Sequence, residues 1–371
     1  MNTLNKDSKL TIGFIGFGLI GGCIAKRLKI QFSNLDIIAY NRSQASLDLA
    51  LNEGTISKAV TNVDESFSEC DYIFLCAPVE NNINYLKQLK SIIKSTCIIT
   101  DVGSVKSNIH HAVIELGLEG NFIGGHPMAG SEKTGYCNAT PFLLENAFYA
   151  ITKTSMTSDS SLKDFTYLVE STGAIPIIMD YATHDYTVAA ISHLPHLIAS
   201  SLVNLVKEYD DDEGHMKQIA AGGFKDITRI ASSSPEMWQQ ICSTNGSNII
   251  NLLEKYISSL VTIKENLQAK TENYVFNMFE SSREYRNSFS NTGSGLIKKD
   301  YSLCCDIIDE TGAISSVALL LSNMRINIKN IGIVHNREHE EGVLKIVFNN
   351  DEDVRNAGDI LNKHGYTVYY R

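Results

Sequence analysis

The sequence predicts an α/β fold built on a parallel sheet, followed by an all-helical region and a C-terminal βαββαβ module. Three observations support this prediction. Short apolar, β-rich runs alternate with amphipathic helical stretches over residues 8–180. Apolar residues at helical spacing, with no strand signal, fill residues 181–289. Strand and helix patterns alternate again over residues 300–371, so we expect three domains with these boundaries.

The elements of each domain follow from the spacing of apolar residues. The predicted strands of the first domain are Leu10–Ile15, Ile37–Tyr40, Tyr72–Ala77, Cys97–Thr100, Phe122–Gly124, Ala147–Thr152 and Ile175–Met179. In the second domain we expect one long helix, Thr183–Tyr209, which Pro195 would bend. The third domain is expected to follow a Ser/Asn/Gly linker, Ser288–Ser294. Its predicted strands are Tyr301–Ile308, Ile326–His335, Gly342–Phe348 and Tyr366–Tyr370, and its helices are Ala313–Asn323 and Asp351–His364.

The composition argues against several classes of protein. The chain has 371 residues and a formal net charge of −10, with no long run of Lys and Arg. Neither nucleic acid nor an anionic membrane is therefore an expected partner. We expect no apolar stretch to approach the roughly 20 residues that cross a bilayer, and the first residues lack the apolar core of a secretory signal. The eight cysteines show no C-x-x-C pair or repeated spacing, which predicts no metal site and a reducing, cytoplasmic location.

A glycine-rich loop follows the first predicted strand. Leu10–Ile15 leads into residues 16–21, Gly-Phe-Gly-Leu-Ile-Gly, and a helical stretch comes next. This pattern predicts a Rossmann-type dinucleotide-binding domain, in which Gly16 allows a tight turn and Gly18 lets the backbone approach a pyrophosphate. Gly21 would allow close packing of helix on strand, and the helix N-terminus would bind the pyrophosphate. The cofactor-binding residues predicted here are Gly16, Gly18, Leu19, Ile20 and Gly21.

The end of the second strand leaves the choice between NAD and NADP open. An NAD site usually ends this strand with Asp or Glu, which binds the ribose 2′-hydroxyl. Here Asn41 and Arg42 follow the strand. Asn41 can still bind a hydroxyl, whereas Arg42 either pairs with a 2′-phosphate or is a solvated surface residue. We expect NAD as the cofactor, with NADP possible.

Three loops follow the carboxyl ends of predicted strands, where open α/β sheets bind ligands. Ala77 and Pro78 lie in the first loop and Asp101 begins the second, so we expect all three to contact the cofactor. Ser104 has the position of an N-cap for the next helix. His126 lies in the third loop among glycines and a proline, either as a surface histidine or as the group that moves a proton near neutral pH.

Two polar groups interrupt the helical region. His193 and His196 are three residues apart and share a helix face, as buried hydrogen-bonded histidines or as substrate contacts. Metal binding is not expected, because no cysteine or carboxylate lies at ligand spacing. Asp226 and Arg229, at i and i+3, fit either a helical ion pair or an arginine held to bind a substrate carboxylate. Trp238, the only tryptophan, is expected in the core unless it neighbours the site.

Taken together, these motifs resemble those of the prephenate dehydrogenase family. The matching strings are the glycine loop, Asp101-Val-Gly-Ser-Val-Lys106, Gly125-His-Pro-Met-Ala-Gly-Ser-Glu132, Ser192-His-Leu-Pro-His196 and Gly222-Gly-Phe-Lys-Asp-Ile-Thr-Arg229. The resemblance runs from about Leu10 to Phe289. Residues 301–371 resemble an ACT domain, a ferredoxin-like module that binds amino acids, through residues 309–314 and Asn330-Ile331.

The resemblance implies a reaction and roles for the motif residues. Members of the family oxidise prephenate to 4-hydroxyphenylpyruvate with loss of CO2 and hydride transfer to the nicotinamide. His126 would take the hydroxyl proton, and Ser104 would hold the hydroxyl and His126 in line. The residues implied in substrate binding are His196, Arg229, His193, Glu132 and Asp226. Two other interpretations stay open: arogenate dehydrogenase, which performs the same oxidation on a substrate with an amino-acid arm, and an amino-acid sensor that has lost catalysis.

The resemblance also implies partners. Family members form homodimers through the helical domain. The ACT-like module implies L-tyrosine as an effector, and a module that only stabilises the dimer is the alternative. The implied effector-binding residues are Gly312, Ala313, Ile314, Asn330 and Ile331.

Overall fold

A computed structural model describes residues 4–130, 133–289, 301–308, 310–335 and 342–370. The chain divides into two compact units, Met1–Thr271 and Glu272–Arg371. Glu132, which we predicted to bind substrate, lies outside the described residues.

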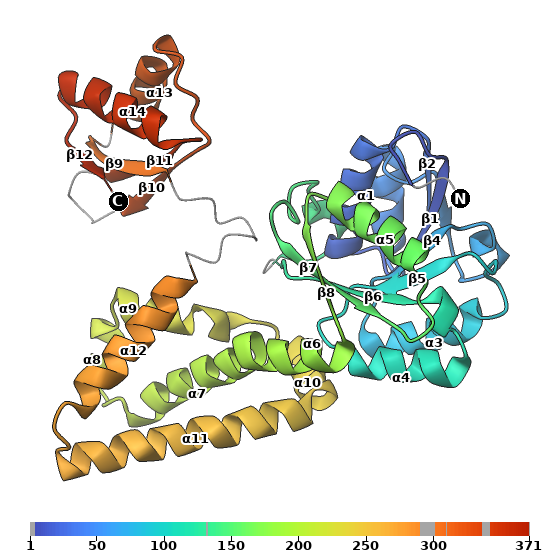
Figure 1. Ribbon diagram of the computed structural model, residues 1–371, viewed down its shortest axis with the longest axis horizontal. Coiled ribbons are helices and arrows are strands. Elements are labelled where there is room, and N and C mark those ends of the chain that lie inside the picture. The colour runs from blue at the N-terminus through green and yellow to red at the C-terminus, as the bar shows by residue number, and fades with distance from the viewer. Residues whose placement is uncertain (1–3, 131–132, 290–300, 309, 336–341, 371) are drawn as a thin grey trace. The chain divides into compact units, whose positions relative to one another are not determined.

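The first unit begins with a five-stranded parallel sheet (Figure 1). Its strands are β1 (Leu10–Ile15), β2 (Leu35–Tyr40), β3 (Lys58–Val60), β4 (Tyr72–Leu75) and β5 (Ile98–Asp101). They lie in the order β3-β2-β1-β4-β5, so β1 pairs with both β2 and β4. The chain therefore crosses over beside β1, and the carboxyl edge at that crossover is where open α/β sheets bind ligands. This is a Rossmann-type nucleotide-binding domain, as the sequence predicts.

Helices cover both faces of this sheet (Figure 1). The helices are α1 (Leu19–Gln31), α2 (Gln44–Asn52), α3 (Val79–Leu89), α4 (Ser107–Leu116) and α5 (Asp159–Ser171). Alternate side chains of β1 point to opposite faces. Phe14 packs in a cluster with Ile24 of α1, whereas Ile15 packs in a second cluster with Leu86 of α3. Two cores, one on each face, therefore hold the carboxyl edge in place.

The remaining three strands form a separate small sheet. They are β6 (Ile123–Pro127), β7 (Phe148–Lys153) and β8 (Ile175–Met179), and β6 runs antiparallel to β7. We expected these strands in one parallel sheet with the others, which is wrong, because apolar alternation reports a strand but not the direction of its partner. An isolated parallel bridge between Ile99 and Phe122 still aligns the start of β6 with β5. The three-residue β3 was not predicted.

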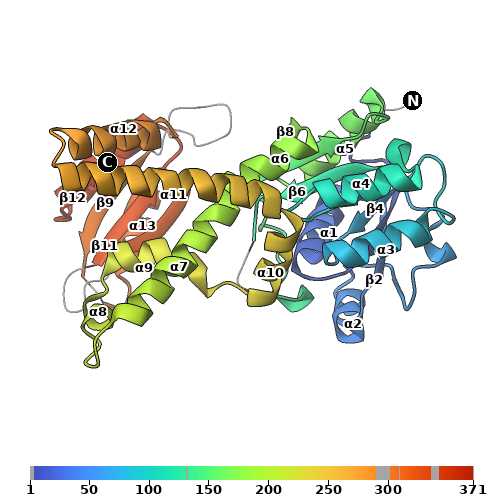
Figure 2. The same ribbon diagram turned by 90° about the horizontal axis from the view of Figure 1, so that it is seen from below.

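Helices fill the rest of the first unit. They are α6 (Tyr181–Val188), α7 (Leu194–Tyr209), α8 (His215–Ile219), α9 (Gly222–Thr228), α10 (Pro235–Thr244) and α11 (Gly246–Ala269). Short turns of helix are η1 (Glu65–Phe67), η2 (Glu119–Asn121), η3 (Tyr136–Asn138), the π-helical η4 (Ala189–His193) and η5 (Arg229–Ser232). Figure 2 shows α7 and α11 as long helices that extend from the region of α6 and α10. The described part of residues 181–289 contains no strand, so the all-helical prediction is confirmed.

The predicted helix Thr183–Tyr209 is interrupted by η4. Pro195, which we expected to bend this helix, lies in the first turn of α7, directly after the π-helical turn η4. Turns of π-helix inside α-helices are often found at functional sites, and η4 ends at His193.

The continuous run Tyr181–Tyr209 is also apolar. Its 29 residues are long and apolar enough to cross a membrane by length and composition, with a mean hydropathy of 1.3 over the best window. Our expectation that no stretch approaches that length is therefore wrong by this measure. The run nevertheless contains Asp185 and His193, both buried and hydrogen-bonded, and charged or polar groups are costly inside a bilayer.

The second unit contains one helix and a small α/β module. The elements are α12 (Tyr274–Ser288), β9 (Ser302–Ile307), α13 (Ala313–Asn323), β10 (Asn330–His335), β11 (Gly342–Val347), α14 (Asp351–Lys363) and β12 (Val368–Tyr370). The strands are antiparallel in the order β10-β11-β9-β12. Val317 of α13 and Leu361 of α14 pack against the sheet residues Leu303 and Leu344. The predicted βαββαβ order is confirmed.

Candidate active site

The glycine loop has the geometry that the sequence predicts. Gly16 has a φ of +90°, and a Cβ there would lie 2.5 Å from the backbone nitrogen of Ala77. A Cβ on Gly21 would lie 3.3 Å from Cys76 Sγ, so α1 packs closely beside the end of β4. Gly18 is the N-cap of α1, and a Cβ added to Gly18 would have no protein atom within 4 Å. The loop thus leaves open space at a helix N-terminus, which fits the pyrophosphate of a dinucleotide.

Other predicted cofactor contacts lie at the same carboxyl edge. Asn41 follows β2, and its Nδ2 lies 3.5 Å from the Ser43 carbonyl oxygen, while Arg42 is exposed. Leu19, Ile20 and Ala77 are half-buried, and Pro78 is exposed at the start of α3.

Asp101 and Lys106 form a buried ion pair behind this edge. Neither side chain is exposed, and Lys106 Nζ also donates to the Gly125 carbonyl oxygen at 2.7 Å. The Asp101 carboxylate accepts from the N–H groups of Gly103 and Gly125. Burial lowers the pKa of Lys106, and the Asp101 charge opposes that shift. The structure therefore encloses the Asp101 carboxylate in the protein, where it joins the loop after β5 to β6.

His126 begins a chain of three hydrogen-bonded side chains. It lies on β6, and not in a loop as we expected, because β6 continues to Pro127. His126 Nδ1 lies 2.9 Å from His184 Nε2, and His184 Nδ1 lies 2.8 Å from Asp185 Oδ1. His184 and Asp185, both on α6, are each only 1% exposed.

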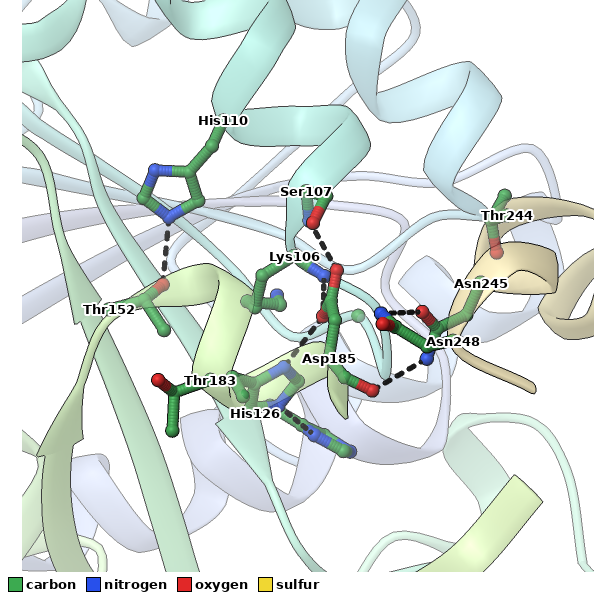
Figure 3. Close-up of polar contacts among 12 residues, drawn as sticks. Lys106, Ser107, His110, His126, Thr152, Thr183, Asp185, Thr244, Asn245 and Asn248 are labelled. Carbon is green, nitrogen blue, oxygen red and sulfur yellow. Dashed lines mark hydrogen bonds and ion pairs between the residues drawn. The ribbon is translucent and has the colours of Figure 1, made fainter. Parts of the chain in front are cut away.

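The Asp185 carboxylate also caps α4 (Figure 3). Its Oδ1 accepts from the N–H of Lys106 and its Oδ2 from the N–H of Ser107, both at 2.8 Å. Ser104 has the sequence position of an N-cap, but α4 begins at Ser107 and a residue distant in sequence supplies the cap. Ser104 is half-buried in the loop after β5. The side chain of Lys106 joins this loop to Gly125, which precedes His126.

Burial and nearby charge set the protonation of these groups. Burial, together with electrostatic interactions with His184 and Lys106, lowers the pKa of His126 well below its usual value of 6.5. Burial alone would raise the pKa of Asp185, but hydrogen bonds from His184 and from the start of α4 hold it below its ordinary value. At neutral pH His126 is therefore an uncharged imidazole, and Asp185 is ionised.

Asn245 and Trp238 contact the two predicted histidines of the helical region. Asn245 Nδ2 donates to His193 Nδ1 at 3.2 Å and to the Asp185 carbonyl oxygen at 2.8 Å. Burial lowers the pKa of His193 to about 4. The Trp238 ring stacks on His196 with centroids 4.0 Å apart and meets the His193 ring edge-on at 5.9 Å. Trp238 therefore neighbours the site, which was the exception that we allowed for it.

A pocket of about 190 Å³ lies beside Trp238. His196 and Ile230 are among its lining residues. Trp238 Nε1 is buried without a hydrogen-bond partner in the part of the chain that the structure describes. Arg229 directly precedes Ile230 at the start of η5, and Asp226 lies on α9, with both side chains exposed. The structure thus brings Arg229 and His196 to the same part of the helical region.

Sequence reasoning missed three residues of this site, namely His184, Asp185 and Asn245. His184 and Asp185 lie in a run that reads as an apolar helix, and their contacts span 58 and 79 residues. The available signal was a pair of polar residues within that run, which alone does not reveal partners on β6 and α4. Among the described residues, no group of three or more His, Cys, Asp or Glu side chains could hold a metal ion.

The predicted effector residues all lie in the second unit. Gly312 has a φ of +98° and is the N-cap of α13, which Ala313 and Ile314 begin. Asn330 and Ile331 begin β10, an edge strand of the sheet.

Two family models match most of the chain. The model of the prephenate dehydrogenase nucleotide-binding domain matches residues 24–178, and that of the prephenate dehydrogenase dimerization domain matches residues 180–281. Among solved structures, prephenate dehydrogenase from A. aeolicus in complex with hydroxyphenyl propionate and NAD+ matches with a TM-score of 0.71 and 31% identity. This match covers 76% of this chain and 99% of that one. Synechocystis arogenate dehydrogenase matches with a TM-score of 0.69 and 26% identity, over 76% of this chain and 100% of that one.

Curated relatives match over nearly the full length. Prephenate dehydrogenase from Bacillus subtilis (strain 168) is 34% identical over 365 residues, which is 98% of each chain. Prephenate dehydrogenase from Lactococcus lactis subsp. cremoris (strain MG1363) is 33% identical over 94% of this chain and 96% of that protein. The glycine loop lies at the carboxyl edge, and Gly125, next to His126, bonds to Asp101 at the end of β5. Together with this geometry, these matches show that the chain belongs to the prephenate dehydrogenase family.

Proposed function

We propose that this chain oxidises prephenate to 4-hydroxyphenylpyruvate and CO2 with a nicotinamide dinucleotide as hydride acceptor. The observation that carries the proposal is the chain of hydrogen bonds from Asp185 through His184 to His126. It supplies a neutral base at the carboxyl edge that also carries the glycine loop. The similarity to two prephenate dehydrogenases over nearly the whole chain supports the substrate.

NAD is the proposed cofactor, with NADP as an alternative. The open space at Gly18 fits a pyrophosphate, and Asn41 lies where a ribose hydroxyl would bind. Residue 41 is an asparagine and carries no negative charge, so it would not repel the 2′-phosphate of NADP. The exposed side chain of Arg42 could pair with that phosphate. When bound, the cofactor supplies the hydride acceptor.

His126 manages the proton in the proposed mechanism. It accepts the hydroxyl proton at Nε2 as hydride leaves the hydroxyl-bearing ring carbon of the substrate. The ring carboxylate leaves as CO2, its bonding electrons enter the ring, and the ring becomes aromatic. His126 then returns the proton to the phenolate oxygen, so no net proton is released. Because aromatisation drives the reaction, the protein mainly orients the substrate, and Ser104 is proposed to hold the hydroxyl in line with His126.

The helical region is proposed to bind the rest of the substrate. Arg229 would bind a carboxylate through its planar guanidinium, beside the pocket that His196 lines. His193 would support this arrangement through its contact with Asn245. Asp226 and Glu132 complete the proposed set of substrate-binding residues.

A turnover assay tests the proposed function. The full chain is mixed with prephenate or arogenate, each with NAD or NADP, and the reduced nicotinamide is followed by absorbance. We expect turnover with prephenate and NAD to have the highest kcat/KM of the four combinations. Higher kcat/KM with arogenate would assign the alternative substrate. Cofactor binding without turnover of either substrate would instead favour the sensor that has lost catalysis.

A homodimer in the cytoplasm is proposed as the working form. Large apolar side chains on η4, α7 and α11 are exposed in the single chain, namely Ile191, Leu205, Ile250, Ile257 and Leu260. Exposed large apolar side chains on neighbouring helices mark an interface, and a second copy of the chain would cover them. The match of residues 180–281 to a dimerization domain supports this arrangement. All eight cysteines are free thiols, which fits a reducing compartment.

The C-terminal module is proposed to be a ferredoxin-like ACT domain that binds L-tyrosine. Its βαββαβ order and the strand order β10-β11-β9-β12 support that topology. The proposed site includes Gly312, Ala313 and Ile314 at the start of α13, with Asn330 and Ile331 on β10. Bound tyrosine would bias the chain against its active arrangement.

A further inference from the structure

We propose that His184 and Asp185 are positioning residues that hold His126 in one tautomer, with its proton on Nδ1 and a free lone pair on Nε2. The proposal rests on the proposed function for what His126 does with that lone pair. His184 and Asp185 act through His126 and are not proposed to touch the substrate.

The direction of the hydrogen bonds follows from the charge of Asp185. An ionised carboxylate only accepts, so His184 Nδ1, 2.8 Å from Asp185 Oδ1, must donate its proton. With one ring proton, on Nδ1, His184 has its lone pair on Nε2. The 2.9 Å contact between His184 Nε2 and His126 Nδ1 needs one proton, which His126 must supply. The lone pair of His126 is therefore on Nε2, the nitrogen that does not face His184.

The same chain of contacts stabilises His126 when it takes a proton. The charged ring would still donate from Nδ1 to His184, and the negative charge of Asp185 lies one residue further along. Lys106 and His193 oppose this positive charge, but the charge of Lys106 is paired with Asp101. A hydrogen-bond acceptor on the other ring nitrogen sets the tautomer and orientation of a catalytic histidine, as the aspartate does in a Ser-His-Asp triad.

The roles of His184 and Asp185 in folding can be separated. Asp185 also accepts from the N–H groups of Lys106 and Ser107, so its replacement would uncap α4. His184 is not part of that cap. Its side chain is 1% exposed and similar in size to phenylalanine, so His184→Phe removes the hydrogen bonds and keeps most of the packing.

The test compares two variants of His184 with a matched control. Glutamine can accept from His126 and donate to Asp185, so His184→Gln keeps the order of donors and acceptors. The control is His110→Phe, because His110 is also buried, bonds to Thr152 Oγ1 at 2.8 Å, and lies outside the chain of contacts. With prephenate and NAD, we expect His184→Phe to lower kcat on the order of 10²-fold with little change in KM. We expect His184→Gln to stay within about 10-fold of the wild type, and His110→Phe to keep kcat.

Nitrogen-15 NMR of the full chain tests the tautomer without turnover. The His126 ring signals are assigned by their loss in His126→Gln. We expect the proton on Nδ1 in the wild type and in His184→Gln, and a mixture of tautomers in His184→Phe. A wild-type His126 with its proton on Nε2, or an unchanged kcat in His184→Phe, would overturn the proposal. If the wild type turns over neither prephenate nor arogenate, the proposed function fails, while the NMR result still decides the tautomer.

Discussion

His126, Lys106 and Asp185 show how neighbouring residues keep a half-buried imidazole uncharged at neutral pH. The Lys106 ammonium is fully buried, and removing its partner Asp101 would leave an unpaired charge at a cost of about 3–5 kcal/mol. Paired in this way, Lys106 keeps positive charge near His126 and helps to lower the pKa of that imidazole. The sequence identified His126 because glycines flank it. It did not identify His184, because a contact across 58 residues leaves no local pattern.

Arg229→Ala tests the proposed substrate anchor. Loss of a charged hydrogen bond costs about 1.5–3 kcal/mol, so we expect KM for prephenate to rise about 10–100-fold while Kd for NAD stays within a few-fold. Lys217→Ala, which removes another exposed cation from the helical region, is the matched control and should leave KM unchanged. Weakened NAD binding with a normal substrate KM would remove Arg229 from the substrate site.

The buried histidines make stability depend on pH. Burial lowers the pKa values of His110 and His193 to about 4, and that of His126 also lies below 6.5. Between pH 6.5 and about 4 these residues bind protons mainly when the chain unfolds, so stability present at pH 7 is lost as pH falls. We expect the urea midpoint to fall between pH 7 and pH 5, because below pH 6.5 each such histidine lowers the free energy of unfolding by up to about 1.4 kcal/mol per pH unit. His110→Phe should flatten this dependence, and a midpoint independent of pH in this range would contradict it.

Among the elements, the glycine loop and α4 are positioned by different means. Local sequence predicts the loop, because β1, the three glycines and α1 are contiguous. The start of α4 could not be placed the same way, since its cap is the Asp185 carboxylate from α6. The antiparallel pairing of β6 with β7 was likewise hidden, because strand direction depends on tertiary contacts that periodicity does not record.

Two glycine variants separate folding from cofactor binding within the loop. A side chain on Gly18 meets no protein atom within 4 Å, so Gly18→Val should keep the thermal midpoint and raise Kd for NAD at least about 10-fold. A Cβ on Gly16 would lie 2.5 Å from Ala77 N at a positive φ, so Gly16→Ala should lower the thermal midpoint itself. Calorimetry gives the thermal midpoint and an NAD titration gives Kd, so together they distinguish the effects of the two variants. Normal NAD affinity in Gly18→Val would contradict the proposed pyrophosphate site.

For the whole molecule, the chain divides into a unit that holds all the proposed catalytic residues and a unit that holds none of them. The order of α/β, helical and βαββαβ regions was predictable, because each has its own apolar period. The solved relatives match 76% of this chain with 99–100% of their own length. The buried polar contacts within the apolar run Tyr181–Tyr209 could not be predicted from the sequence, because a mean hydropathy over a window hides single polar residues.

Truncation after Phe289 tests regulation by the C-terminal module. We expect the shortened chain to keep kcat within a few-fold and to lose inhibition by L-tyrosine, because the proposed tyrosine site lies beyond that residue. The full chain, assayed in parallel with millimolar tyrosine, is the control. A full chain that neither binds tyrosine in calorimetry nor responds to it would contradict the regulatory role and leave a module that stabilises the dimer.

The measurement that most directly tests catalysis by a neutral, positioned histidine is kcat of His126→Asn with prephenate and NAD. Asparagine keeps a polar side chain on β6 but removes the proton acceptor. We predict a fall in kcat on the order of 10²-fold or more, with Kd for NAD and the thermal midpoint near those of the wild type. A kcat within a few-fold of the wild type would show that His126 is not the base.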